Sequence, residues 1–397
     1  MTALSALSPR TRPQPSHEQA DAAAGPLPAS GAWRPEHGAG DRRFASVGPL
    51  RLESGALLDD VQMAYETWGQ LDADGSNAVL VLHALTGDSH VRGAVGPGHP
   101  SGGWWEQMVG PGRPIDTDRY FVIAPNVLGG CQGSTGPSSD AADGRPWGSR
   151  FPRVTVRDQV SAERALRDQL GIDRWALVIG GSMGGMRALE WAVCHPQEVQ
   201  RLAVIASAAR ASADQIAWNS AQIAAIEADP GFHGGDYYHL GPGEGPHRGL
   251  GIARRIAHTT YRTAEELEAR FANRAQGEED PLHGDGRHQV TSYLDHHATK
   301  LARRFDANSY LTLVRSMNTH DVGRGRGGLA KALGRVRART LVVAITTDRL
   351  FPRPLVAETA QHIDGAVMHC ASSPIGHDAF LLAHPHLDRW IVELLAR

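Results

Sequence analysis

Short runs of consecutive apolar residues recur along most of the chain, separated by polar or glycine-rich segments. Runs of about four to eight apolar residues are typical of central strands in a parallel sheet, which is buried on both faces. Such strands alternate with amphipathic helical patterns, which predicts an α/β fold with a mostly parallel central sheet flanked by helices. The predicted strands are 78–83, 120–126, 175–179, 202–206, 340–345 and 366–370, and the predicted core helices are 156–170, 186–195 and 385–395.

Three stretches depart from this alternation. Residues 1–43 are rich in Pro, Ala, Ser and Gly without periodicity, so we expect a disordered N-terminal arm with no catalytic role. Residues 44–68 alternate apolar and polar positions, which predicts an antiparallel pair of strands. Residues 209–328 show helical periodicity only, which predicts an all-helical insertion. We therefore expect a core of residues 44–208 and 329–397, with 209–328 as a helical lid over the site.

A glycine-rich turn with one serine at its tip follows the predicted strand 175–179. Residues 180–185 contain the pattern G-x-S-x-G between a strand and a helix, which is typical of a nucleophile elbow. Such a turn strains the backbone of Ser182 and exposes its Oγ, while the N–H of Met183 and the helix N-terminus can hold an oxyanion. A chance match is the alternative in a chain with 45 glycines, but the strand and the helix are both in place.

Two later residues complete the chemistry that a serine nucleophile needs. Asp348 follows the predicted strand 340–345, and His377 follows the last predicted strand, which gives the chain order Ser, Asp, His. The imidazole can take the serine proton and return one later, and the carboxylate orients the imidazole. Asp364 competes for the role of Asp348, but it precedes Gly365 and has the character of a turn residue.

The loop after strand 78–83 is predicted to supply the second oxyanion donor, the N–H of Leu85. His83 precedes this loop, so we interpret it as structural. Residues 323–328 match G-x-G-x-x-G formally, but no strand precedes them, which excludes a dinucleotide site. Residues 129–136 form a glycine-rich loop, but no helix with Gly-Lys-Ser/Thr follows it, so it is not a P-loop. Paired histidines such as 296–297 lack the acidic partners of a metal motif, so we expect no metal site.

Composition narrows the class further. The chain has 397 residues, 41% of them hydrophobic, which is enough for a large core. A net charge of −3 favours neither nucleic acid nor an anionic membrane as partner. Three widely spaced cysteines indicate no disulfide framework or zinc site, and no apolar run reaches the length of a membrane span. The N-terminus lacks the apolar segment of a signal peptide, so we expect a cytoplasmic enzyme.

Five segments carry motifs that are informative together, namely 83–87, 180–186, 253–262, 318–325 and 376–380. Together they resemble the homoserine O-acetyltransferase family of the α/β-hydrolase superfamily. The resemblance covers roughly residues 44–397 and is specific as a joint pattern, since each motif alone indicates only an α/β hydrolase. It implies transfer of acetyl from acetyl-CoA to the hydroxyl of L-homoserine in methionine biosynthesis, with acetyl-CoA as co-substrate, no permanently bound cofactor, and a homodimer formed through the lid helices.

The resemblance also implies how homoserine is held. It places Arg254 on the substrate carboxylate and Asp378 on its ammonium, with assistance from Tyr261. A guanidinium suits a carboxylate because it can donate two parallel hydrogen bonds. From the residues alone, Arg254 could equally form a surface ion pair on the lid, and Asp378 could cap the following helix.

The acyl donor and acceptor stay open at this level. Relatives that use succinyl-CoA tend to carry a tryptophan directly after the triad aspartate, whereas this chain has Arg349, which resembles the acetyl-using branch. L-Serine is a possible acceptor, since one methylene is worth only about 1–3 kcal/mol in a pocket. A serine esterase or deacetylase needs the same triad, and a non-enzymatic relative is disfavoured because all three triad residues are present.

Overall fold

The computed structural model of the protein describes residues 25–284 and 286–396. Its centre is an eight-stranded sheet in the order β1-β4-β8-β5-β9-β10-β11-β12. The five neighbouring pairs from β8 to β12 are parallel, and β4 is antiparallel to both β1 and β8. The strands are β1 (Arg43–Ser46), β4 (Gln62–Trp68), β5 (Ala78–Leu82), β8 (Phe121–Pro125), β9 (Leu177–Gly181), β10 (Arg201–Ile205), β11 (Arg339–Ile345) and β12 (Val367–Ala371).

Helices cover both faces of this sheet, which explains why the central strands have continuous apolar sequences. Leu80 and Leu82 of β5 join the cluster that contains α2 and α3, whereas Val79 and Val81 join the cluster that contains α11. Alternate side chains of a strand point to opposite faces, so every position of β5 is buried. The core helices are α2 (Val156–Gln169), α3 (Met183–Cys194), α9 (Leu329–Leu333), α10 (Arg353–Gln361) and α11 (Pro385–Ala396). Two small sheets pair β2 (Leu50–Arg51) with β3 (Leu57–Leu58) and β6 (Val109–Gly110) with β7 (Ile115–Asp116).

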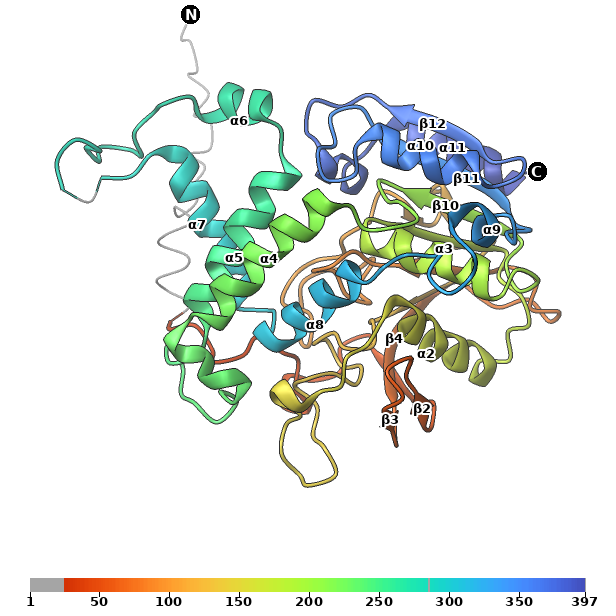
Figure 1. Cartoon of the computed structure of the whole chain (residues 1–397), viewed down its shortest axis with the longest axis horizontal. Helices are drawn as coiled ribbons and strands as arrows, with labels where there is room; N and C mark the ends of the chain where they lie inside the picture. The colour runs from red at the N-terminus through yellow and green to blue at the C-terminus, as the bar shows by residue number, and fades with distance from the viewer. Residues whose placement is uncertain (1–24, 285, 397) are drawn as a thin grey trace, which may run out of the picture.

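A helical insertion separates β10 from α9 and lies to one side of the sheet (Figure 1). The chain enters and leaves it at one place, because Arg210 and Asp321 form an antiparallel bridge and the N–H of Val322 donates to the carbonyl of Ala209. Within it, α5 packs against both α4 and α7. The helices of the insertion are α4 (Ala213–Glu227), α5 (His247–Tyr261), α6 (Ala264–Phe271), α7 (Gln289–Ala302) and α8 (Ala307–Asn318), with the short 3-10 helix η3 (Pro230–Gly235) between α4 and α5. Short 3-10 helices outside the insertion are η1 (Pro35–His37), η2 (Gly148–Arg150) and η4 (His377–Leu381).

Residues 25–43 differ from the disordered arm expected there. Ala32 is buried, the N–H of Gly31 donates to the carbonyl of Phe305, and the N–H of Trp33 donates to the carbonyl of Cys131. The segment therefore lies between the helical insertion and the core. This sequence without periodicity forms only the short 3-10 helix η1, but its backbone groups still find partners on other segments. The rest of the predicted arm, residues 1–24, lies outside the described residues.

Among the helices that the structure describes, none has the length and apolar character needed to cross a membrane.

Candidate active site

The serine turn joins β9 to α3 with a strained backbone. Ser182 has φ 56° and ψ −125°, in the region of positive φ that residues with a Cβ rarely occupy. The flanking glycines allow the close approach that this turn requires. A Cβ on Gly180 would collide with the backbone of Gly184, and a Cβ on Gly184 would collide with the carbonyl of Leu82 at the end of β5. The turn therefore has the geometry expected for a nucleophile elbow, with Ser182 at its tip.

His377 and Asp348 form a buried hydrogen-bonded pair. Nδ1 of His377 lies 2.7 Å from Oδ2 of Asp348. The other oxygen, Oδ1, accepts the backbone N–H groups of Leu350 at 2.8 Å and Phe351 at 2.9 Å, so the carboxylate is fixed in orientation. Because a carboxylate accepts at Nδ1, the proton of the neutral imidazole lies there and Nε2 is left as the basic nitrogen.

Aromatic rings fix the plane of the His377 imidazole. The ring of Phe351 stacks on it at a centroid distance of 5.4 Å, and the ring of Phe380 meets it edge-on at 5.5 Å. Phe380 also connects this loop to the elbow, because a Cβ on Gly181 would collide with its ring. The structure thus packs the residue before Ser182 against the loop that carries His377.

The electrostatics of His377 have opposing contributions. Burial lowers the pKa of its imidazole, but the charge and hydrogen bond of Asp348, helped by Asp378, outweigh burial. The net pKa lies above the ordinary value of 6.5. A raised pKa makes the imidazole a stronger base, at the expense of more protonation at mildly acidic pH.

The two predicted oxyanion donors, Leu85 and Met183, are buried in the same apolar cluster. Met183 begins α3, where the first N–H groups of a helix have no partner within the helix. Leu85 lies in the loop after β5, and the helical insertion contacts this loop, since Nη1 of Arg304 donates to the carbonyl of Thr86 at 2.8 Å. His83 is structural as expected: its Nε2 accepts the N–H of Val127 at 3.0 Å, and burial lowers its pKa to about 3.

The residues implied to bind homoserine gather on the His377 side. Arg254 and Tyr261 come from α5, and Asp378 directly follows His377. The guanidinium carbon of Arg254 lies 5.6 Å from the centroid of the Tyr261 ring, which is itself 5.6 Å from the His377 ring. Burial raises the pKa of the Tyr261 hydroxyl to about 12, so this group stays protonated. Nε of Arg254 is buried and has no hydrogen-bond partner among the described residues.

Asp378 has a partner that the sequence analysis did not single out. Nη1 of Arg262 lies 3.6 Å from Oδ2 of Asp378, and Arg262 also forms an ion pair with Glu266 at 2.6 Å. Burial raises the pKa of Asp378, opposed by the charges of Arg254, His377 and Arg262. Arg262 directly follows Tyr261 within residues 253–262, one of the segments that carry the family resemblance. The sequence could therefore have identified Arg262 as a candidate site residue.

Among the described residues, one group of side chains has ligand types that suit a metal ion, namely Asp41, Glu66, His90 and His99, with ligand atoms within 4.8 Å of one another. Hydrogen bonds already engage Glu66, both ring nitrogens of His90 and Nε2 of His99. Nδ1 of His90 lies 2.9 Å from Glu66, its Nε2 faces the carbonyl of Ala94 at 3.3 Å, and Nε2 of His99 accepts the N–H of Asp41 at 3.0 Å. The geometry fits a hydrogen-bonded ion pair of a doubly protonated His90 with Glu66, not a metal centre.

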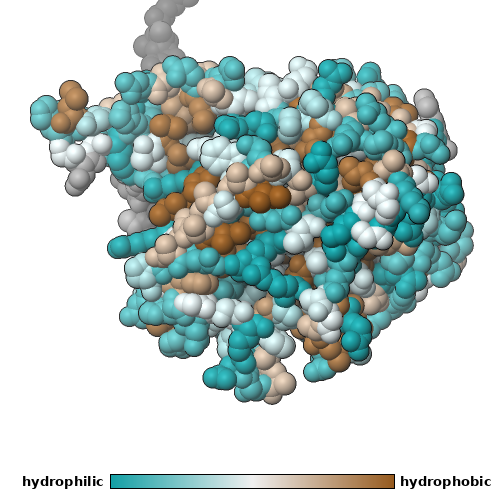
Figure 2. Space-filling view, in the orientation of Figure 1, coloured by the Kyte–Doolittle hydropathy of each residue, from teal (hydrophilic) through white to brown (hydrophobic). Residues whose placement is uncertain are grey.

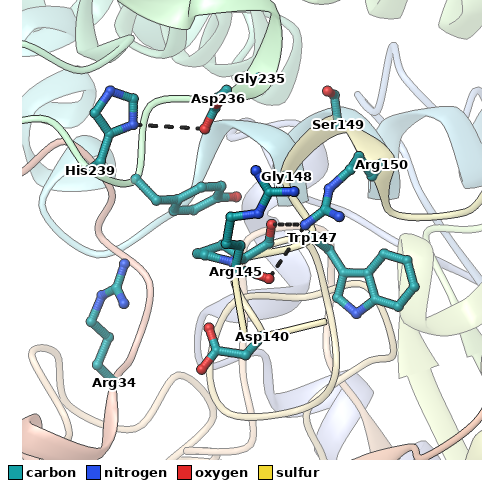
Figure 3. A pocket seen from close by; sticks show the side chains of 12 residues that line it. Arg34, Asp140, Arg145, Trp147, Gly148, Ser149, Arg150, Gly235, Asp236 and His239 are labelled. Atoms are coloured by element: carbon teal, nitrogen blue, oxygen red, sulfur yellow. Dashed lines mark hydrogen bonds and ion pairs between the residues drawn. The ribbon is translucent and has the colours of Figure 1, made fainter. Parts of the chain in front are cut away.

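A cavity of about 670 Å³ lies between the loop before α2 and η3 (Figure 3). It is lined by none of the residues predicted for the site. Arg145 and Arg150 on its wall both bind Asp143, and Arg150 also donates to the carbonyl of Pro146. Arg145 and Arg150 are therefore engaged in holding the loop.

Comparisons with known proteins agree with the class that the fold and the serine site define. A sequence model described as the alpha/beta hydrolase fold matches residues 77–383. The homoserine O-acetyltransferase of Thermobifida fusca is 61% identical over 374 residues, which cover 94% of this chain and 98% of that protein. The enzyme of the same name from Clavibacter michiganensis is 56% identical, over 93% of this chain and 96% of that protein. The chain belongs to the homoserine O-acetyltransferase family of α/β hydrolases.

The solved structures that are similar to this chain include both transferases and esterases. The homoserine O-acetyltransferase of Bacillus anthracis has a TM-score of 0.82 at 26% identity, covering 90% of this chain and 97% of that one. Esterase E22 has a TM-score of 0.81 at 28% identity, covering 89% of this chain and 99% of that one. At this similarity, the shape of the chain alone does not separate acyl transfer from ester hydrolysis.

Proposed function

We propose that the protein transfers the acetyl group of acetyl-CoA to the hydroxyl of L-homoserine, giving O-acetyl-L-homoserine and CoA in methionine biosynthesis. The observation that carries this proposal is the hydrogen-bonded pair of His377 and Asp348, packed against the Ser182 elbow, in a chain 61% identical to a homoserine O-acetyltransferase. Acetyl-CoA acts as a co-substrate, and we propose no permanently bound cofactor.

The first half of the reaction acylates the serine. Nε2 of His377 takes the proton of Ser182 Oγ as Oγ attacks the thioester carbonyl. The resulting oxyanion receives the N–H groups of Leu85 and Met183. The carbon–sulfur bond then breaks, the thiolate of CoA takes the proton held by His377, and the acetyl group stays on Ser182 as an ester.

The second half transfers the acetyl group to the amino acid. The homoserine hydroxyl gives its proton to Nε2 of His377 and attacks the acetyl-serine carbonyl, with the same two N–H donors on the oxyanion. Collapse of this intermediate breaks the bond to Ser182 Oγ, which takes the proton back. Asp348 stabilises the imidazolium that forms in both halves.

Charges on both sides of His377 suit an α-amino acid. The unpaired Nε of Arg254 is available to a carboxylate, and Asp378 can accept the ammonium while Arg262 holds it. This arrangement favours a zwitterionic acceptor over water, and so a transferase over an esterase. Arg349 lies 5.3 Å over the ring of Trp218 on α4, so the position after Asp348 contacts the lid. We retain acetyl as the transferred group because this residue is not the tryptophan of the succinyl-using relatives.

A panel of two donors and two acceptors tests this proposal. Acetyl-CoA and succinyl-CoA are each combined with L-homoserine and L-serine, and CoA release is measured with product identification by mass spectrometry. Acetyl-CoA with homoserine should give the highest kcat/KM, with parallel double-reciprocal lines and exchange of labelled CoA into acetyl-CoA when homoserine is absent. Hydrolysis that is undiminished by homoserine would indicate an esterase. Intersecting lines without CoA exchange would refute the acetyl-serine intermediate.

We also propose that the protein forms a homodimer through its lid helices. Apolar side chains form a band over α4 and α5 on the face shown in Figure 2, where Ile216 is 40% and Ile252 is 47% exposed. Exposed apolar bands of this kind commonly mark protein interfaces. Analytical ultracentrifugation should show a dimer that Ile252→Lys dissociates, whereas Val392→Lys, at a 48% exposed position on α11, should not dissociate it. A monomeric wild-type protein would refute the proposal.

A further inference from the structure

The helices α5 and α7 pack antiparallel and present polar side chains to each other. The rings of His258 and His297 stack at 4.0 Å, and Nε2 of His258 lies 2.6 Å from the hydroxyl of Tyr293. Arg254 lies one turn before His258 on α5, and Lys300 lies one turn after His297 on α7. Residues three or four apart share a helix face, so Arg254 and Lys300 come opposite each other in this antiparallel pair. Along the contact between the two helices, the aromatic cluster of His258, Tyr293 and His297 is thus followed by a group of cations.

Three cations meet at this end of the helix pair: Arg254, Lys300 and Arg304. Arg304 reaches the loop of Leu85 through its bond to the carbonyl of Thr86. Lys300 is exposed to solvent, while Arg254 and Arg304 are half-buried. Partial burial and the charges of Arg304 and Arg254 lower the pKa of Lys300, in agreement with the helix contact that brings Lys300 opposite Arg254.

Few charges among the described residues compensate these cations. No carboxylate described in the structure forms an ion pair with any of the three, and Asp378 near Arg254 and Asp88 near Arg304 act only through longer-range charge interactions. A group of like charges held together by two packed helices is costly unless an anion binds there. The group therefore has the properties of a binding site for an anionic ligand.

We propose that Lys300 and Arg304 bind the phosphate groups of the acyl donor, next to the carboxylate site at Arg254. This inference rests on the proposed function. The carboxylate of homoserine neutralises one charge, which Arg254 supplies, so two positive charges are left for a second substrate. Acetyl-CoA carries several negative phosphate charges at the end of a long arm. Lys300 lies at the solvent side of the group, where that end of the donor would remain while the thioester enters toward Ser182.

Lysine labelling tests the site directly, because the chain has only two lysines, Lys300 and Lys331. Lys331 is exposed on α9 and serves as an internal control. Both amines are propionylated with a limiting amount of an N-hydroxysuccinimide ester, and labelling is quantified by peptide mass spectrometry. At about four times its Kd, CoA should lower the labelling of Lys300 about fivefold by mass action and leave Lys331 unchanged.

Three further probes identify what is bound. Pantetheine, which lacks the phosphates, should not protect Lys300, and 3′-dephospho-CoA shows whether the diphosphate suffices. Inorganic phosphate at the same concentration should protect weakly. Protection by inorganic phosphate equal to that by CoA would indicate a general anion site and overturn the assignment. Equal protection by pantetheine, or no protection by CoA, would also overturn it.

Kinetics provide the second measurement. Lys300→Ala should raise the KM for acetyl-CoA about tenfold more than the KM for acetyl-N-acetylcysteamine, a thioester without phosphates, since a charged hydrogen bond is worth about 1.5–3 kcal/mol. Lys300→Arg should largely restore KM, and Lys331→Ala should have no effect. Equal changes for both thioesters would overturn the inference. If neither thioester acetylates Ser182, the proposed function fails instead, while the labelling experiment still reports on CoA binding.

Discussion

Replacing Arg187 by leucine should destabilise the protein more than any surface charge change. Arg187 lies on α3 and its Nη1 donates to Oε1 of Glu163 on α2 at 2.7 Å, with both side chains fully buried. Its Nη2 donates to the carbonyl of His83 at 2.8 Å, at the end of β5. The other oxygen of Glu163 accepts the indole N–H of Trp191 at 2.7 Å. The substitution therefore leaves a buried carboxylate with one remaining hydrogen bond.

The expected loss in the free energy of unfolding follows from leaving the charge of Glu163 without its counter-ion. Removing one partner of a buried ion pair costs about 3–5 kcal/mol, because the remaining charge has lost both water and its counter-ion. That is a large part of the roughly 5–15 kcal/mol by which folded proteins are stable. Arg389→Leu breaks the exposed pair of Arg389 with Glu393 on α11 and should cost no more than about 1 kcal/mol.

The loss should also depend on pH. Burial raises the pKa of Glu163 above 4.5, and Arg187 opposes this rise. In Arg187→Leu the opposition is removed, so the folded-state pKa of Glu163 rises further. Above pH 4.5 the folded protein then binds more protons than the unfolded chain, and the free energy of unfolding falls as the pH increases through the raised pKa. The variant should lose more stability at pH 8 than at pH 5.

Urea unfolding followed by circular dichroism at these two pH values measures both effects. The double variant Arg187→Leu with Glu163→Gln is the decisive comparison, because glutamine is neutral and still offers an acceptor to Trp191. The double variant should have a free energy of unfolding about 2 kcal/mol higher than that of Arg187→Leu, and this free energy should no longer depend on pH through residue 163. Equal stability of the two variants, or a loss that is the same at both pH values, would refute the reasoning.

Three further predictions concern the proposed catalytic residues. Ser182→Ala should give no acetyl adduct in intact-mass spectra after mixing with acetyl-CoA, whereas Ser220→Ala, at an exposed position on α4, should give one; an adduct on the first variant would exclude Ser182. The rate should rise with pH through a limb centred above 6.5, because Asp348 raises the pKa of His377 more than burial lowers it; a limb below 6.5 would contradict this. Arg254→Ala should slow transfer to homoserine about tenfold more than acetylation from acetyl-CoA, since only homoserine presents a carboxylate to Arg254; equal losses would assign Arg254 a structural role.

Local sequence was sufficient for the sheet and for the elbow. The continuous apolar run of β5 predicted a strand buried on both faces, and its burial in two different clusters confirms this. The pattern around Ser182 predicted a strained turn because only glycine permits the backbone approach seen at Gly180 and Gly184. The switch from strand to helical periodicity after β10 likewise predicted the helical insertion. These features depend on neighbours within a few residues, which a sequence pattern records.

Only the tertiary structure decided the partners of the charged residues and the course of residues 25–43. Helical periodicity treats Glu163 and Arg187 as polar positions, yet they are buried because two helices bring opposite charges together. Arg304 and Thr86 are 218 residues apart, and their contact exists only because the helical insertion packs against the loop after β5. Such pairings arise from the packing of whole elements, and the energy of each charge depends on that packing. The sequence by itself therefore determined which elements form, and the fold determined which charges those elements compensate or leave for a ligand.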